Sequence, residues 1–90
     1  MSTWDDLERR WKRLRRRAER DLRDAAALAA EGTPGALHEA RSIRGFAGDI
    51  LRHCRAWETI CEVGRRGEEI DYVACYDAAR RPRRRAEVTA

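Results

Sequence analysis

The sequence predicts an all-α protein built as a long antiparallel helical hairpin with a short third helix. Two observations predict this fold class. Apolar residues recur at alternating steps of three and four along two long segments, which is the spacing of helices packed lengthwise on one another. Two glycine-containing breaks, at residues 32–35 and 64–67, separate three segments. A short Gly-Pro loop between two long helices makes them antiparallel neighbours.

The first predicted helix covers residues 4–31. Its apolar positions are Trp4, Leu7, Trp11, Leu14 and Ala18, followed by Leu22, Ala25 and Leu28. Gly32 supplies the stop signal. Acidic residues placed four positions before a basic one predict ion pairs along the helix surface, namely Asp5–Arg9, Asp6–Arg10 and Glu19–Arg23.

The second predicted helix covers residues 34–63, with Thr33 as its N-cap and Pro34 in its first turn. Its apolar positions are Ala40, Ile43, Ala47, Ile50, Cys54, Trp57 and Cys61. Gly45 and Gly48 interrupt this pattern, and each costs about 1 kcal/mol relative to alanine in a helix. We interpret them as sites of close approach by the first helix or by a partner, rather than as a kink.

A shorter third helix is predicted over residues 68–81, and Pro82 ends it. Residues 1–81 therefore form a single helical domain. Residues 82–90 follow as a basic tail that contains Arg83, Arg84 and Arg85.

Large apolar residues are scarce in this chain. Leu, Ile, Val and Phe together number 14, whereas alanine alone numbers 15. Two helices cannot close a core around the large side chains that are present, so we expect oligomerisation or a partner protein to complete it. The residues expected at that contact are Trp4, Leu7, Trp11, Leu14, Phe46, Ile50 and Trp57.

Several classes of protein are excluded by the sequence. No apolar run is long enough to span a bilayer, and no basic-then-apolar leader is present, so we expect a cytoplasmic or virion-associated protein that is not secreted. Cys54 and Cys61 are seven residues apart, too far for one metal ion, and we interpret them with Cys75 as buried packing residues. His53 and Cys54 are adjacent on a helix and do not form a pair. We expect no enzyme activity, no cofactor, no metal and no small-molecule substrate.

Positive charge is concentrated at the two ends of the chain. Residues 9–17 contain seven bases and no acid, whereas residues 32–64 carry four bases and four acids. The basic positions form a ridge opposite the apolar face of the first helix, together with the tail: Arg9, Arg10, Arg13, Arg16, Arg17, Arg20, Arg83, Arg84 and Arg85. One interpretation is a surface that binds a nucleic-acid phosphate backbone. The other is a solvated or protein-contacting helix face.

Two stretches carry a loose resemblance to a group of known proteins. They are Trp4-Asp5-Asp6-Leu7-Glu8-Arg9-Arg10-Trp11 and Ala40-Arg41-Ser42-Ile43-Arg44-Gly45-Phe46. Together they resemble small helical proteins encoded among the structural genes of tailed bacteriophages, over residues 4–60. The resemblance implies a non-enzymatic accessory of virion structure or assembly. The expected function is thus a helical interaction protein, with a nucleic-acid-binding or regulatory adaptor as the alternative.

Overall fold

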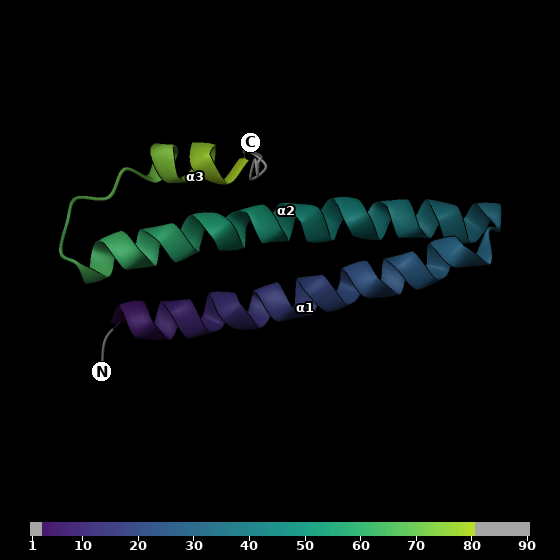
Figure 1. The fold of residues 1–90 in the computed structure, drawn as a ribbon, viewed down its shortest axis with the longest axis horizontal. Helices are drawn as coiled ribbons and strands as arrows, with labels where there is room; N and C mark the ends of the chain where they lie inside the picture. The colour runs from purple at the N-terminus through teal and green to yellow at the C-terminus, as the bar shows by residue number, and fades with distance from the viewer. Residues whose placement is uncertain (1–2, 81–90) are drawn as a thin grey trace, which may run out of the picture.

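The computed structural model describes residues 3–80, which contain three helices: α1 (Thr3–Glu31), α2 (Pro34–Arg65) and α3 (Tyr72–Arg80). The predicted all-α class and the helical hairpin are confirmed. As Figure 1 shows, α1 and α2 run antiparallel along their whole length, and α3 returns along the side of α2 that faces away from α1. Helix α2 is therefore the middle of three layers. The predicted tail at 82–90, with Arg83, Arg84 and Arg85, lies outside the described residues.

The hairpin turn follows the chemistry expected from the sequence. Gly32 adopts a φ of 77°, a left-handed conformation that favours glycine, and it ends α1. The Thr33 hydroxyl accepts a hydrogen bond from the Ala36 amide at 3.2 Å, and Pro34 begins α2. Two residues are thus enough to reverse the chain.

Helix α3 begins four residues later than the sequence predicted. Gly67 turns the chain at a φ of 76°, and the Glu68 amide then donates to the Val63 carbonyl at 3.2 Å, which closes the end of α2. The Asp71 carboxylate accepts a hydrogen bond from the Ala74 amide at 3.0 Å and caps α3. Residues 68–71 are therefore used as a connection between the two helices.

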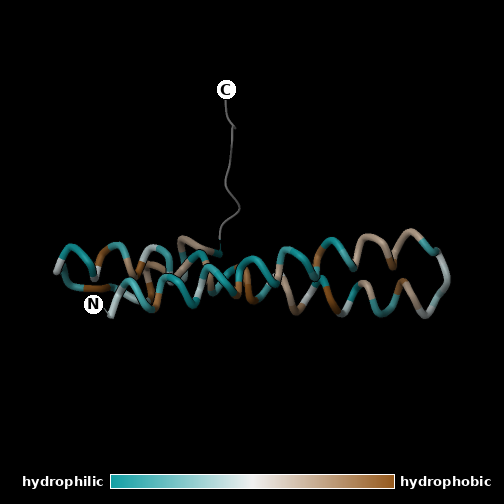
Figure 2. The backbone as a smooth tube through the Cα atoms, turned by 90° about the horizontal axis from the view of Figure 1, so that it is seen from below, coloured by the Kyte–Doolittle hydropathy of each residue, from teal (hydrophilic) through white to brown (hydrophobic). Residues whose placement is uncertain are grey.

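The interior consists almost entirely of small side chains. The buried residues are Ala18 and Ala25 of α1, Ala36, Ala40, Ala47, Cys54, Ala56, Ile60 and Cys61 of α2, and Cys75 and Ala79 of α3. Among the Leu, Ile, Val, Phe and Trp side chains of residues 3–80, Ile60 alone is buried. Figure 2 shows hydrophobic and hydrophilic residues alternating along both long helices. The larger apolar side chains other than Ile60 are at least partly exposed to solvent.

Ion pairs between α1 and α2 connect the open end of the hairpin. Arg65 bonds to Glu8 at 2.7 Å and to Asp5 at 3.1 Å, and Arg15 pairs with Glu58. The hydrogen bond from Arg65 to Glu8, together with the nearby carboxylates, raises the pKa of the Arg65 guanidinium.

These inter-helix pairs correct the ion pairs expected from the sequence. Asp5 and Glu8 bond to Arg65 of α2, and Asp6 pairs with Arg9 at i,i+3 in place of Arg10. Glu19 and Arg23 form no ion pair with any residue in the described part of the chain. For Asp5, a base on the neighbouring helix competes for the carboxylate, and helix periodicity alone does not show where that base lies.

We predict that the small-residue interior is intolerant of larger side chains. Ala25→Leu places three extra carbon atoms at a position that is 0% exposed, so it should lower the free energy of unfolding by about 1–3 kcal/mol. The neighbouring Ala26 is exposed, and Ala26→Leu should change that free energy by less than about 0.5 kcal/mol. Urea unfolding followed by circular dichroism measures both. Equal effects of the two substitutions would contradict the packing described here.

Candidate functional site

The aromatic residues expected at a contact surface divide between the interior of the hairpin and its surface. Trp11 and Trp57 stack with ring centroids 5.6 Å apart and planes 8° apart, so they join α1 to α2. Trp4 lies against Gly64, where its indole ring occupies the space that a Cβ would need. Phe46, by contrast, is 70% exposed. Phe46 is therefore the aromatic side chain of this set most available to a partner.

The aliphatic members of the same set have an intermediate position. Leu7, Leu14 and Ile50 are half-buried. Each therefore contributes to the hairpin and also presents part of its apolar surface to solvent. A polypeptide packed on a flank of the hairpin would bury the remainder.

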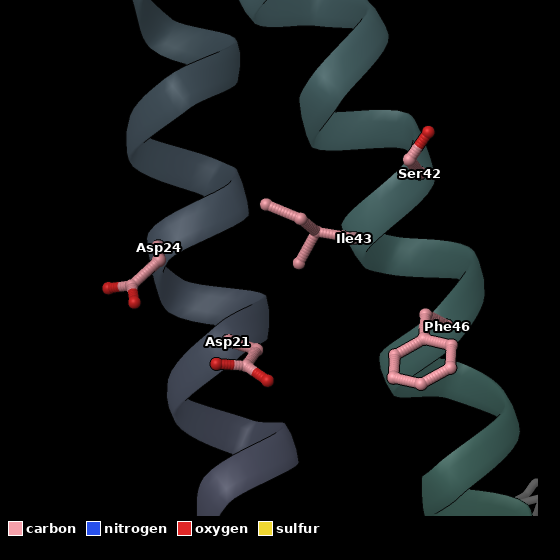
Figure 3. A pocket seen from close by; sticks show the side chains of 5 residues that line it. All are labelled: Asp21, Asp24, Ser42, Ile43 and Phe46. Carbon is pink, nitrogen blue, oxygen red and sulfur yellow. The ribbon is translucent and has the colours of Figure 1, made fainter.

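Phe46 borders a shallow groove between α1 and α2, with a volume of about 340 Å³. Asp21 and Asp24 of α1 form one wall, and Ser42, Ile43 and Phe46 of α2 form the other. In Figure 3 the Ile43 side chain points toward α1, while both carboxylates lie on the α1 side. Neither aspartate forms an ion pair with another residue in the range 3–80. The groove thus combines an apolar floor with uncompensated negative charge.

The arginine ridge of α1 is exposed, and most of it has no acidic partner. Arg9 pairs with Asp6, and Lys12 lies 3.8 Å from Glu8. The remaining ridge residues have no carboxylate within 4 Å among the residues that the structure describes: Arg10, Arg13, Arg16, Arg17 and Arg20. All five are exposed. Within the described part of the chain, the middle of the ridge therefore has few acidic partners.

A second basic site was not expected from the sequence. Its concavity of about 400 Å³ is lined by Arg44, Gly45, Gly48, Asp49, Arg52, Arg55 and Arg80. Arg55 donates to the Ala79 carbonyl near the end of α3, at 3.1 Å from Nη2, and Arg52 pairs with Asp49. Because the bases come from two helices whose relative position is a tertiary property, sequence spacing does not reveal this cluster.

The two glycines in this concavity correct the close approach expected between the long helices. A Cβ built at Gly45 or Gly48 meets no atom within 4 Å, so neither glycine is required for packing among the described residues. Both glycines line the concavity together with Arg80, the last residue of α3. The sequence also allowed that a partner, in place of α1, approaches α2 closely at Gly45 and Gly48, and this stays a prediction.

Polar side chains also join α2 to α3. The Trp57 indole donates to the Tyr76 hydroxyl at 2.9 Å, and that hydroxyl lies 3.0 Å from Nδ1 of His53. The Tyr72 ring is tilted against Trp57, with centroids 6.2 Å apart. His53 thus has a partner 23 positions away in the sequence, and the contact attaches α3 to the hairpin.

The three cysteines are free thiols buried in the interior. Burial raises the pKa values of the Cys54 and Cys61 thiols. The described residues contain no group of three or more His, Cys, Asp or Glu side chains that could hold a metal ion. This environment fits the interpretation of the cysteines as packing residues.

Comparisons with protein-family models, with curated proteins and with solved structures give no match to this chain. Within residues 3–80, no helix is both long enough and apolar enough to cross a membrane. The functional argument therefore rests on the surfaces described above.

We predict that the thiols are protected in the folded protein. Cys54 and Cys61 are 0% exposed, and their raised pKa values lower the thiolate fraction at pH 8. Their reaction with a disulfide reagent at pH 8 should therefore be slower by on the order of 100-fold or more than in denaturant. The release of the coloured thiolate measures the rate in each condition. Rapid labelling of either residue in the native state would show that α1 and α2 separate readily.

Proposed function

We propose that this chain is a non-enzymatic helical interaction protein, which buries its remaining apolar surface against another polypeptide. One observation carries the proposal: Ile60 is the only large aliphatic or Trp side chain that residues 3–80 bury completely. Burial of apolar area contributes about 25 cal/mol per Å², so partly exposed side chains retain a driving force for association. The partner is a second copy of the chain or a larger complex.

The flank of the hairpin that carries Phe46 is the surface best suited to such a contact. Exposed aromatic side chains dominate the energetics of protein interfaces. Phe46 stands beside an apolar groove with Ile43, and Ile50 lies one helical turn further along α2. The sequence resemblance implies a virion or an assembly intermediate as one larger complex in which such a hairpin would act. The protein would then be located in the cytoplasm or in the virion.

We predict that the purified protein is an oligomer at micromolar concentration, with a mass of two or more chain masses. Light scattering after size-exclusion chromatography measures it, with and without nuclease treatment. The oligomer should survive nuclease treatment, because apolar contacts between polypeptides do not need nucleic acid.

Two single substitutions test the surface in the same measurement. Phe46→Ser should weaken the association at least about tenfold, while Val73→Ser, at 71% exposure on α3, should not weaken it. A monomer at every concentration would contradict self-association and leave a different polypeptide as the partner.

A second candidate function is backbone binding of nucleic acid by the ridge. The observation that favours it is the run of exposed arginines without acidic partners among the described residues. Arginine neutralises phosphates and releases their counterions, so binding of this kind weakens steeply with salt. Both long helices exceed the length of a helix-turn-helix unit, and the binding would therefore have little sequence specificity.

We predict for this second candidate that a labelled DNA duplex binds more weakly to Arg10→Glu/Arg16→Glu/Arg20→Glu. The loss should be tenfold or more at about 50 mM salt, with a shallower dependence on salt concentration. Fluorescence anisotropy at about 50 and 200 mM salt measures both quantities. The control Arg41→Glu/Arg44→Glu/Arg52→Glu makes the same charge change on α2. Arg44 and Arg52 of the control line the second basic concavity, so equal losses in the two variants would mean that net charge or both basic surfaces contribute, and would contradict a ridge-specific site.

A further inference from the structure

We propose that the flank of the hairpin bearing Phe46 is a two-fold symmetric interface with a second, antiparallel copy of this chain. The inference rests on the proposed function and names the partner. Its basis is a charge stripe, which we define as Arg13, Arg17, Asp21 and Asp24 of α1. The steps of four, four and three place the four side chains on one line along the helix surface.

The charges of this stripe are uncompensated within the described chain. None of its four residues has an oppositely charged group within 4 Å among residues 3–80. Arg17 and Asp21 are at i,i+4, but the base precedes the acid, which is the less favourable order for an ion pair on a helix. Along this line two bases are therefore followed by two acids, and none of the four side chains forms an ion pair among the described residues.

This order of charges is self-complementary when the helix meets an inverted copy of itself. In an antiparallel pair, Arg17 lies opposite the partner's Asp21 if the two-fold axis passes residue 19, the midpoint of those positions. The midpoint of Arg13 and Asp24 is 18.5, so the same axis brings these two residues together as well. Two-fold symmetry doubles each contact, and four ion pairs result.

The position of this axis also suits the length of the hairpin. The middle of α1 (Thr3–Glu31) is residue 17, so an axis near residue 19 makes the two copies of the helix overlap over nearly their whole length. A flank about 43 Å long and two helices wide has a projected area of about 800 Å². That area is what a stable interface buries on each partner.

Apolar residues lie beside the charge stripe on the same flank. The groove between α1 and α2 is lined by Asp21 and Asp24 together with Ile43 and Phe46 (Figure 3). The 70% exposed ring of Phe46 would enter this region of the interface, where a second copy supplies its own Phe46 and Ile43. Apolar contacts then provide affinity, and the charges fix the register.

The mixture of charges favours a protein partner on this flank over a polyanion. Asp21 and Asp24 would repel phosphate groups. Arg13 and Arg17 belong to both the ridge and the stripe, whereas Arg9 and Arg16 lie on the outermost line of the helix, opposite its apolar residues. The two surfaces therefore differ in the partner that their chemistry fits.

Charge reversal tests the proposal with two variants of the full chain. Arg13→Glu/Arg17→Glu makes the stripe entirely acidic, and Asp21→Lys/Asp24→Lys makes it entirely basic. Like charges then meet across the two-fold axis, so each variant alone should self-associate about 100-fold or more weakly than the wild type. An equimolar mixture should restore dimers, because every acidic position of one variant meets a basic position of the other. Light scattering, with an affinity tag on one variant, measures the mass and composition of the complex.

Matched controls place the same charge changes outside the stripe. Arg16→Glu/Arg23→Glu and Glu19→Lys/Glu62→Lys should keep the wild-type mass, and circular dichroism should show that every variant is helical. If the stripe variants also keep the wild-type mass, or if their mixture stays monomeric, this interface is wrong while association through another surface stands. A wild-type chain that is monomeric at about 100 μM would overturn the self-association itself.

Discussion

The close packing of α1 on α2 through alanine and cysteine is the constraint on which the rest of the structure depends. Ala18 and Ala25 of α1, with Ala47 and Cys54 of α2, have side chains small enough to let two helix backbones approach closely. Of the larger apolar side chains of residues 3–80, Ile60 alone is buried, and the others stay at least partly exposed to solvent. The interior of the hairpin therefore consists of small side chains, while apolar surface remains on its outside. Both properties follow from the α1–α2 contact.

Helix α3, the third layer, is attached to the hairpin through the side chain of Trp57 in α2. Trp57 stacks on Trp11 of α1 and donates a hydrogen bond to Tyr76 of α3, so one indole ring contacts both neighbouring helices. Helix α3 is only nine residues long and packs on part of α2, and among residues 3–80 no atom lies within 4 Å of a Cβ built at Gly45 or Gly48. The length of α3 thus decides which part of α2 is accessible.

The surface divides into regions with different chemistry. One flank combines Phe46 with a stripe whose charges change sign, which suits contact with another protein. The outward line of α1 carries Arg9 and Arg16, which suits an anion, and the concavity at Gly45 and Gly48 is basic as well. A positive net charge therefore says little about this molecule, because the sign of the charge depends on the face that a partner meets.

The sequence by itself determined the local architecture. Three-and-four spacing, the glycine at 32 and the Thr33 cap depend on contacts within a few residues, and the predicted hairpin follows from them. Only the tertiary structure decided which residues meet across helices. Arg65 takes the Asp5 carboxylate that helix spacing assigned to Arg9, and Tyr76 reaches His53. Two of the three Trp residues expected at a partner surface, Trp11 and Trp57, stack on each other. Periodicity shows which face of a helix is apolar, but the axial register between helices, set here by packing of small side chains, decides the partner of each residue.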